Sequence, residues 1–380
     1  MPAVNVDISK GFPNFRLDVS FSAEEGITVL FGPSGAGKTL TLHCIAGFVR
    51  PDSGIVSIAG VTYFDHSKGI DHPIHKRRFG YVPQDVHLFP HMTVHENIAY
   101  GLSRRPKKEA QRAVGEMMEL LRLDGLATLL PREVSGGQRQ RVGLARALVI
   151  EPVALLLDEP FAALDTPVRT KLRGDLLRIR DRFKVPTVLV THDVEEAYFL
   201  ADRVAVLNNG RLEQEGTRED VFYRPQTCRV AEFFDVRNIF SGEVVAVDEP
   251  GGSMRVKTRQ FAVSLPCEPG FRAGAEVEFC IRPEEVMIIR EGQPLKDILK
   301  ENILEGRILR VVDRGALRDL FVCVGREEEF DFLVTLPSHV ARDLNLHAGE
   351  AVMLGLKKPS LWVIPGREDQ GPGPSTEDLQ

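Results

Sequence analysis

The chain has 380 residues, too long for one ordinary hydrophobic core, so two or three domains are expected. Its hydrophobic share of 43% and charged share of 27% are typical of a globular protein in water. The net charge of −6 argues against nucleic acid as the main partner. Five widely spaced cysteines without a C-x-x-C pair indicate neither a disulfide framework nor a zinc site, and we expect reduced thiols, as in a cytosolic protein.

The sequence shows no signal for export or membrane insertion. Residues 1–7 lack the basic and apolar regions of a signal peptide. The longest apolar runs, such as 153–157, are far short of the roughly 20 residues that span a bilayer. We therefore expect any work at a membrane to depend on a partner that spans it.

The first residues alternate between apolar and polar. Over 4–21 this alternation predicts two strands of an antiparallel pair. Phe12 or Phe15 could stack on an adenine ring, although either could also be an ordinary packing residue. The sequence leaves this choice open.

A glycine-rich loop follows a predicted strand at 27–31 and precedes a predicted helix at 40–48. We call it the phosphate loop; it comprises Gly32, Pro33, Ser34, Gly35, Ala36, Gly37, Lys38 and Thr39. Its spacing, G-x-x-x-x-G-K-T, turns backbone N–H groups and the positive end of a helix dipole toward the phosphates of a nucleotide. We expect Lys38 on the β- and γ-phosphates and the Thr39 hydroxyl on Mg²⁺.

Two further loops carry polar residues. Gln84 follows a predicted strand near 78–82, where its amide could coordinate Mg²⁺ or hold a water molecule. After a helical segment at 107–123, Ser135, Gly136, Gly137 and Gln138 precede another helix. Ser135 as cap would make a second anion-binding helix start there. One nucleotide needs one cradle, so a second cradle indicates that two chains share the nucleotide.

Acidic and imidazole groups follow two more predicted strands. The apolar run 153–157 predicts a strand buried on both faces of a parallel sheet, and Asp158 and Glu159 stand at its ligand-binding end. We expect Asp158 in the Mg²⁺ shell and Glu159 polarising water. The next strand, 187–191, ends at His192, which could reach the terminal phosphate. Residues 203–215 predict a hairpin, and the catalytic part ends in a helical segment near Phe234.

The second half consists of short β runs with an internal repeat. Residues 238–244 resemble 302–308, and 273–277 resemble 348–352. Each copy ends in a predicted strand, at 286–289 and 361–364, which predicts two similar small β-barrels, the second with a short helical insert near 338–344. We place the domains at 1–235 and 236–366, with repeats at about 238–291 and 302–365, and expect a disordered polar tail at 367–380.

These motifs, in this order and spacing, resemble the nucleotide-binding subunits of ABC transporters over about 1–235. The resemblance implies an α/β P-loop NTPase core with an antiparallel β subdomain and a helical subdomain, followed by an all-β, OB-like tandem barrel. Two positions depart from the family pattern: Val134 stands in place of leucine, and Ala163 in place of serine. Both replacements keep the backbone elements, so we expect activity to persist.

The resemblance also implies how the site works. Two ATP molecules would lie between the phosphate loop of one chain and residues 135–137 of a second copy, in a head-to-tail dimer. Glu159 would be the general base, His192 the residue that senses the γ-phosphate, and Gln84 the link to transmembrane permease subunits. Gln138 and Asp165 would complete the nucleotide-binding set. The protein would then lie at the cytoplasmic face of the inner membrane, and an extracytoplasmic substrate-binding protein would deliver its cargo.

The barrel pair and the absence of fused membrane helices resemble an importer ATPase. The sequence around the phosphate loop and 88–91 is similar to ATPases of molybdate and tungstate importers, with sulfate, polyamine and ferric iron as alternatives. A soluble ABC regulator or repair protein is a more distant alternative, because the coiled-coil insertion or second cassette of such proteins is missing. The barrels would either sense internal oxyanion and inhibit import, or only hold a dimer together.

Overall fold

In a computed structural model, the chain forms two compact units that divide between Val221 and Phe222. The structure describes residues 3–23, 25–162, 164–267, 270–289, 301–325 and 330–365. The division falls ahead of the expected boundary at 235, because Ala231 and Val236 pack with Cys280 and Ile364 of the second unit. Ala163 and the predicted tail lie outside the described residues.

The first unit is built on an eleven-stranded sheet in the order β6-β5-β4-β1-β2-β11-β10-β3-β9-β8-β7. Its strands are β1 (Val4–Phe12), β2 (Phe15–Ala23), β3 (Ile27–Phe31), β4 (Ser53–Ile58), β5 (Val61–Asp65), β6 (Ile70–Asp71), β7 (Phe79–Val82), β8 (Ala154–Asp158), β9 (Thr187–Thr191), β10 (Arg203–Asn208) and β11 (Arg211–Thr217). Strands β10, β3, β9, β8 and β7 pair in parallel, whereas β1, β2, β4, β5 and β6 form an antiparallel wing. The predicted antiparallel pair over 4–21 is confirmed as β1 and β2.

The centre of this sheet is apolar on both faces. Every residue of β3, β8 and β9 is buried, as continuous apolar runs covered by helices require. Because these strands are parallel neighbours, their carboxyl ends meet at one edge of the sheet. That edge carries the phosphate loop, Asp158 and Glu159 at the end of β8, and His192 after β9.

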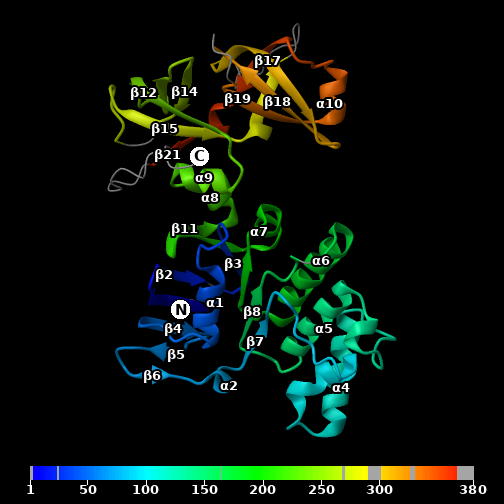
Figure 1. Ribbon diagram of the computed structural model, residues 1–380. Coiled ribbons are helices and arrows are strands. Elements are labelled where there is room, and N and C mark those ends of the chain that lie inside the picture. The colour runs from blue at the N-terminus through cyan, green and yellow to red at the C-terminus, as the bar shows by residue number, and fades with distance from the viewer. Residues whose placement is uncertain are drawn as a thin grey trace. The chain divides into compact units, whose positions relative to one another are not determined.

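The helices of the first unit pack around the sheet. Figure 1 shows α4 and α5 together on the side away from β2, β4 and β5. They are α1 (Lys38–Ala46), α2 (Ile74–Arg77), α3 (Val94–Ala99), α4 (Lys107–Leu120), α5 (Gly136–Leu148), α6 (Thr166–Phe183), α7 (Val194–Leu200) and α8 (Arg218–Tyr223). Short 3-10 turns lie at Tyr100–Leu102 and Pro131–Glu133. The predicted helices after the phosphate loop and over 107–123 are confirmed as α1 and α4.

The second unit begins with the end of α8, followed by α9 (Cys228–Phe233), and contains two five-stranded antiparallel sheets, β14-β13-β12-β15-β21 and β16-β20-β17-β18-β19. Its other elements are β12 (Asn238–Asp248), β13 (Ser253–Lys257), β14 (Ala262–Pro266), β15 (Glu276–Ile281), β16 (Val286–Ile289), β17 (Ile303–Asp313), β18 (Leu317–Cys323), β19 (Phe332–Pro337), α10 (Ser338–Asp343), β20 (Ala351–Leu356), β21 (Trp362–Ile364) and 3-10 turns at Pro283–Glu285 and Lys358–Ser360. The predicted helical insert is α10.

The two repeats exchange their closing strands. Strand β16, the end of the first repeat, pairs with β20 in the second sheet, and β21, the end of the second repeat, pairs with β15 in the first. The expectation that each copy closes on its own strand is therefore corrected. One apolar cluster includes residues of both sheets, such as Val244 and Phe279 with Ile308 and Leu354, so the repeats share a core.

Two buried asparagines strengthen this exchange at equivalent positions of the repeats. Asn238 donates to the carbonyl of Leu333 at 2.9 Å and accepts from its N–H at 2.7 Å. Asn302 donates to the carbonyl of Ser264 at 2.8 Å and accepts from its N–H at 2.7 Å. Each amide thus takes the place of a strand residue against an edge strand of the other sheet.

Among the described residues, no helix is long and apolar enough to cross a membrane.

Candidate nucleotide-binding site

The phosphate loop joins β3 to α1 with a backbone that only glycine tolerates at key positions. Gly32 has a φ of 149°, and a Cβ there would lie 2.1 Å from the carbonyl oxygen of Leu207. Gly37 has a φ of 98°, and a Cβ there would lie 2.9 Å from Leu17 and 3.1 Å from Phe15. The glycines of the motif are therefore required by the left-handed turn and by close packing against neighbouring strands.

Lys38 extends along the loop. Its ammonium donates to the carbonyl oxygens of Gly32 at 2.7 Å and Pro33 at 2.9 Å. Burial lowers the pKa of Lys38, and the nearby Glu159 and Asp158 carboxylates act in the opposite direction. A charge that is nearly buried and held only by carbonyls is well placed to bind phosphate oxygens.

Thr39 and Asp158 form a site that fits a divalent cation. The Thr39 hydroxyl donates to Asp158 Oδ1 at 2.9 Å. Burial raises the pKa of Asp158, and the hydrogen bond from Thr39 partly offsets that effect. One hydroxyl and one carboxylate, completed by phosphate oxygens and water, suit Mg²⁺, which rarely takes an all-protein cage. Consistent with this, no group of three or more metal-ligating acids, cysteines or histidines occurs in the described part of the chain.

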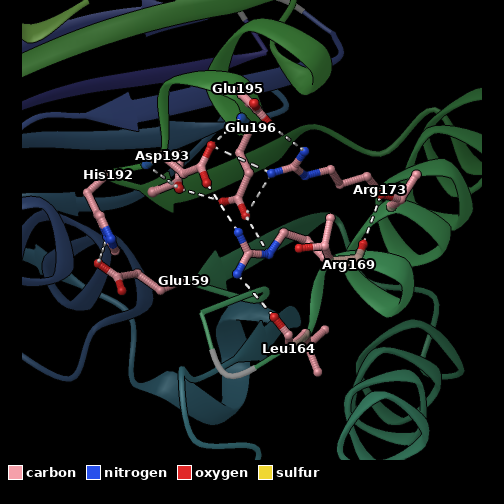
Figure 2. A network of polar contacts seen from close by, with 11 residues as sticks. Glu159, Leu164, Arg169, Arg173, His192, Asp193, Glu195 and Glu196 are labelled. Carbon is pink, nitrogen blue, oxygen red and sulfur yellow. Dashed lines mark hydrogen bonds and ion pairs between the residues drawn. The ribbon is translucent and has the colours of Figure 1, made fainter. Parts of the chain in front are cut away.

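Glu159 and His192 meet beside the phosphate loop (Figure 2). His192 Nδ1 lies 3.1 Å from Glu159 Oε1, so the two side chains share a hydrogen bond. Glu159 has a φ of 42°, a left-handed backbone that costs energy for a residue with a side chain and is common at functional sites. A cavity of about 340 Å³ is lined by Glu159, Phe15 and residues 34–40. The structure thus brings a carboxylate, an imidazole and a phosphate cradle together.

The two aromatic candidates differ in position. Phe15, at the start of β2, lines this cavity. Phe12 is 44% exposed, and the Lys10 ammonium lies 6.0 Å from its ring centroid. Phe15 is therefore the aromatic residue beside the phosphate loop.

The second predicted cradle is a capped helix start. Ser135 caps α5, accepting from the N–H of Gln138 at 3.3 Å, while Gln138 Oε1 accepts from the N–H of Ser135 at 2.7 Å. This capping box leaves the N–H groups of Gly136 and Gly137 among the unpaired donors of the first helical turn. Residues 135–138 do not line the cavity beside the phosphate loop in the described chain.

The cavity beside the phosphate loop is not lined by Gln84 or Asp165 either, within the described chain. Gln84 is exposed and follows the end of β7, which pairs in parallel with β8. Asp165 caps α6, and its carboxylate accepts from the N–H of Val168 at 3.2 Å. Both lie at loops next to the site, so their predicted contacts with nucleotide or partner remain predictions.

Sequence reasoning missed two polar contacts near the site. Tyr81 O–H lies 3.0 Å from His43 Nε2, and burial, with Asp158 nearby, raises the pKa of Tyr81 to about 12. Arg169 and Arg173 of α6 reach acids that follow His192 (Figure 2). The spacing of these arginines places them on one face of α6, but no pattern in the sequence indicates the acids that they reach.

Comparison with known proteins agrees with this geometry. A model of the ABC transporter family matches residues 17–162, and a model of the TOBE domain matches residues 300–363. The site and fold therefore define an ATP-binding protein of the ABC type.

Full-length relatives refine the class. The chain is 37% identical to the molybdate/tungstate import ATP-binding protein WtpC of Pyrococcus horikoshii, over 94% of this chain and 98% of the relative. It is 40% identical to the sulfate/thiosulfate import ATP-binding protein CysA 2 of Shewanella oneidensis, over 94% and 95%. It is 36% identical to the spermidine/putrescine import ATP-binding protein PotA of Nitratidesulfovibrio vulgaris, over 81% of each. The chain belongs to the family of ABC importer ATP-binding subunits, and it is an ATPase coupled to transport.

Proposed function

We propose that the chain energises the import of an oxyanion, with molybdate or tungstate first and sulfate second. The observation that carries this proposal is a match over nearly the whole length of both chains to a molybdate/tungstate import subunit. The sulfate relative matches over a similar length, and the polyamine relative over a smaller part. Oxyanion cargo is thus supported by both of these full-length relatives, and a polyamine cargo is the runner-up.

The proposed catalytic unit is a head-to-tail dimer. Lys38 and the N–H groups of the phosphate loop would bind the phosphates, and Phe15 would stack on the adenine. Thr39 and Asp158 would hold Mg²⁺, with Gln84 at its edge, and the cation would neutralise phosphate charge. Residues 135–138 and Asp165 of the second copy would close on the same nucleotide. The unpaired N–H groups at the start of α5 support this role.

Glu159 would take a proton from the attacking water, and His192 would bind the γ-phosphate. The 3.1 Å contact between these side chains supports their acting on the same group. Replacing Glu159 by glutamine would remove the base but keep its shape, so hydrolysis should fall by about 100-fold or more while ATP binding persists. We place the dimer at the cytoplasmic face of the membrane, on permease subunits that span it.

A feedback role for the second unit has less support. A cavity of about 660 Å³ in this unit is lined by Lys257 and Arg259 but also by Glu243, Glu276 and Glu278. Three carboxylates beside two cations would repel an oxyanion. Calorimetric titration of the full chain with molybdate, tungstate and sulfate would decide between sensing and a purely dimerising role.

Cargo is tested by uptake in cells that carry either the native chain or Glu159→Gln. We expect the variant to lose molybdate and tungstate accumulation, measured by mass spectrometry of cell metal content, and to keep sulfate and polyamine uptake. Loss of sulfate or polyamine uptake instead would replace the proposed cargo. Unchanged uptake of all four would count against a transport role for this site.

A further inference from the structure

Two arginines of α6 form a network with acids that follow His192 (Figure 2). Arg173 donates to Glu196 at 3.3 Å and lies 3.6 Å from both Asp193 and Glu195. Arg169 donates to Asp193 at 3.4 Å and lies 3.9 Å from Glu196. Glu196 is only 4% exposed, and burial raises its pKa, whereas the Thr191 hydroxyl and the Arg173 guanidinium act in the opposite direction.

The acids of this network fix the turn that carries His192. The Thr191 hydroxyl donates to Glu196 at 2.6 Å and accepts from the N–H of Asp193 at 3.1 Å. Asp193 in turn caps α7 by accepting from the N–H of Glu196 at 2.9 Å. His192 thus stands between two residues that are held by the network, and its backbone cannot shift without moving these contacts.

Arg169 also reaches the segment before α6. Its second terminal nitrogen donates to the carbonyl oxygen of Leu164 at 3.0 Å. The Leu164 side chain lies beside the start of α5, because a Cβ built at Gly136 would be 3.9 Å from Leu164 Cδ2. The first turn of α6 also packs on the start of α5, since a Cβ built at Gly137 would lie 2.2 Å from Val168. One guanidinium therefore connects the His192 turn to the residues that pack on the second cradle.

We propose that Arg169 is a positioning residue that sets His192 relative to Leu164 and the start of α5. The inference rests on the proposed two-chain ATP site. In that dimer, His192 would contact the nucleotide on its own phosphate loop, whereas the start of α5 would contact the nucleotide of the partner. Arg169 then transmits the state of one ATP site to the other, because it bonds to segments that serve each of them.

Arg173 supplies a matched control within the same network. It pairs with the same acids, and within the described parts of the chain its ion pairs are with Asp193, Glu195 and Glu196. Replacing Arg173 by methionine removes a buried cation and leaves the link from Arg169 to Leu164 in place. A role in stability alone would affect both arginine variants, whereas a bridging role would affect Arg169 alone.

The test measures ATP hydrolysis and nucleotide affinity of the full chain as wild type, Arg169→Met, Arg173→Met and Arg169→Lys. We expect Arg169→Met to lower kcat by tenfold or more and to abolish any cooperativity in ATP, with the affinity for a fluorescent ATP analogue unchanged within twofold. Arg173→Met should stay within about threefold of wild type in kcat. Arg169→Lys should not restore turnover, because an ammonium lacks the planar fork that reaches two segments.

Melting temperatures of the variants separate positioning from folding. Equal kcat values for the two methionine variants, or full rescue by lysine, would overturn the proposal. A parallel loss of nucleotide affinity in Arg169→Met would do the same, because it would indicate collapse of the site rather than altered coupling. Failure of the Glu159→Gln variant to dimerise with ATP, measured by light scattering, would instead contradict the proposed two-chain site.

Discussion

At the scale of single residues, the site combines groups whose charges are costly until a ligand arrives. Lys38 is held by two loop carbonyls, and Asp158 is buried beside a neutral hydroxyl. Both pKa shifts have burial as their largest cause, and each disfavours the charged form. A phosphate group with a divalent cation would compensate both charges together, so these two residues suit a nucleotide with its metal.

Asp158→Asn tests this reasoning. A carboxyl whose native pKa is raised contributes most to stability below its ordinary pKa, and that contribution is lost as the pH rises through the raised value. At a pH well above the raised pKa, Asp158 therefore destabilises the chain in the absence of nucleotide. We expect the variant, without nucleotide, to melt at a higher temperature than wild type in differential scanning calorimetry at pH 7.

With Mg²⁺ and ATP the order should reverse. Ligand at about 100 times its dissociation constant stabilises wild type by about 2.7 kcal/mol, and the variant should gain much less because a cation ligand is lost. Asp343→Asn is the control, since Asp343 is an exposed carboxylate on α10 of the second unit. A variant at Asp158 that melts below wild type without nucleotide would contradict the argument.

At the scale of elements, local signals were sufficient for the catalytic edge. Apolar runs predict buried strands, and the glycine spacing of the phosphate loop is set by the backbone of the loop itself. The predictions of β3, α1 and β8 are therefore confirmed. Contacts between distant segments were not predictable in this way. The link from Arg169 to Asp193 depends on how α6 and α7 pack, which no local pattern specifies.

The exchange of closing strands has the same cause. Because β16 and β21 are equivalent parts of a repeat, the sequence of either strand does not indicate which of the two sheets it joins. The asparagines at the start of each repeat are polar residues in a buried position, which indicates a specific partner but does not name it. Their partners, Leu333 and Ser264, lie in the opposite sheet.

Asn302→Ala measures the value of this reciprocal pairing. The substitution leaves the partly buried N–H and carbonyl of Ser264 without their partners, at a cost of about 1 kcal/mol or more per group. We expect the second unit to lose about 2 kcal/mol or more of unfolding free energy. Trp362 is the single tryptophan of the chain and lies on β21, so its fluorescence during urea unfolding reports this unit.

Two further variants calibrate that measurement. Asn238→Ala should cost a similar amount, because its amide makes the equivalent pair of hydrogen bonds with Leu333. Glu305→Ala, at an exposed position of β17, should change stability by no more than about 0.5 kcal/mol. Losses of equal size in all three variants would show that the asparagine pairing has no special weight.

At the scale of the whole molecule, the chain divides its tasks between two units. The first holds the phosphate loop, Asp158, Glu159 and His192, and the second is a pair of sheets whose repeats exchange their closing strands. Trp362 donates its indole N–H to the carbonyl of Pro225 at 2.9 Å, which also fixes the last strand to the segment where this unit begins. Strand β21, which closes the second repeat, is thus a structural part of the first sheet.

A chain that ends at Ser360 tests this dependence. It lacks β21, including Val363 and Ile364, which are buried against the first sheet. Burial of each such side chain stabilises a domain by about 1.5–3 kcal/mol, a large fraction of the 5–15 kcal/mol that holds a typical domain folded. We expect hydrogen exchange of β15 amides, Glu276–Ile281, to lose protection, although β15 lies 80 residues or so before the cut.

The control is a chain that ends at Pro365, which keeps every described strand and should exchange like wild type. ATP binding should survive in both truncated chains, because the phosphate loop and the aromatic Phe15 belong to the first unit. If β15 kept its protection in the chain ending at Ser360 while β20 and β17 lost theirs, the closing strand would contribute nothing to the first sheet. Loss in β15 together with β12, its antiparallel neighbour, would instead mean that the exchanged strand stabilises the repeat it joins rather than the one it ends.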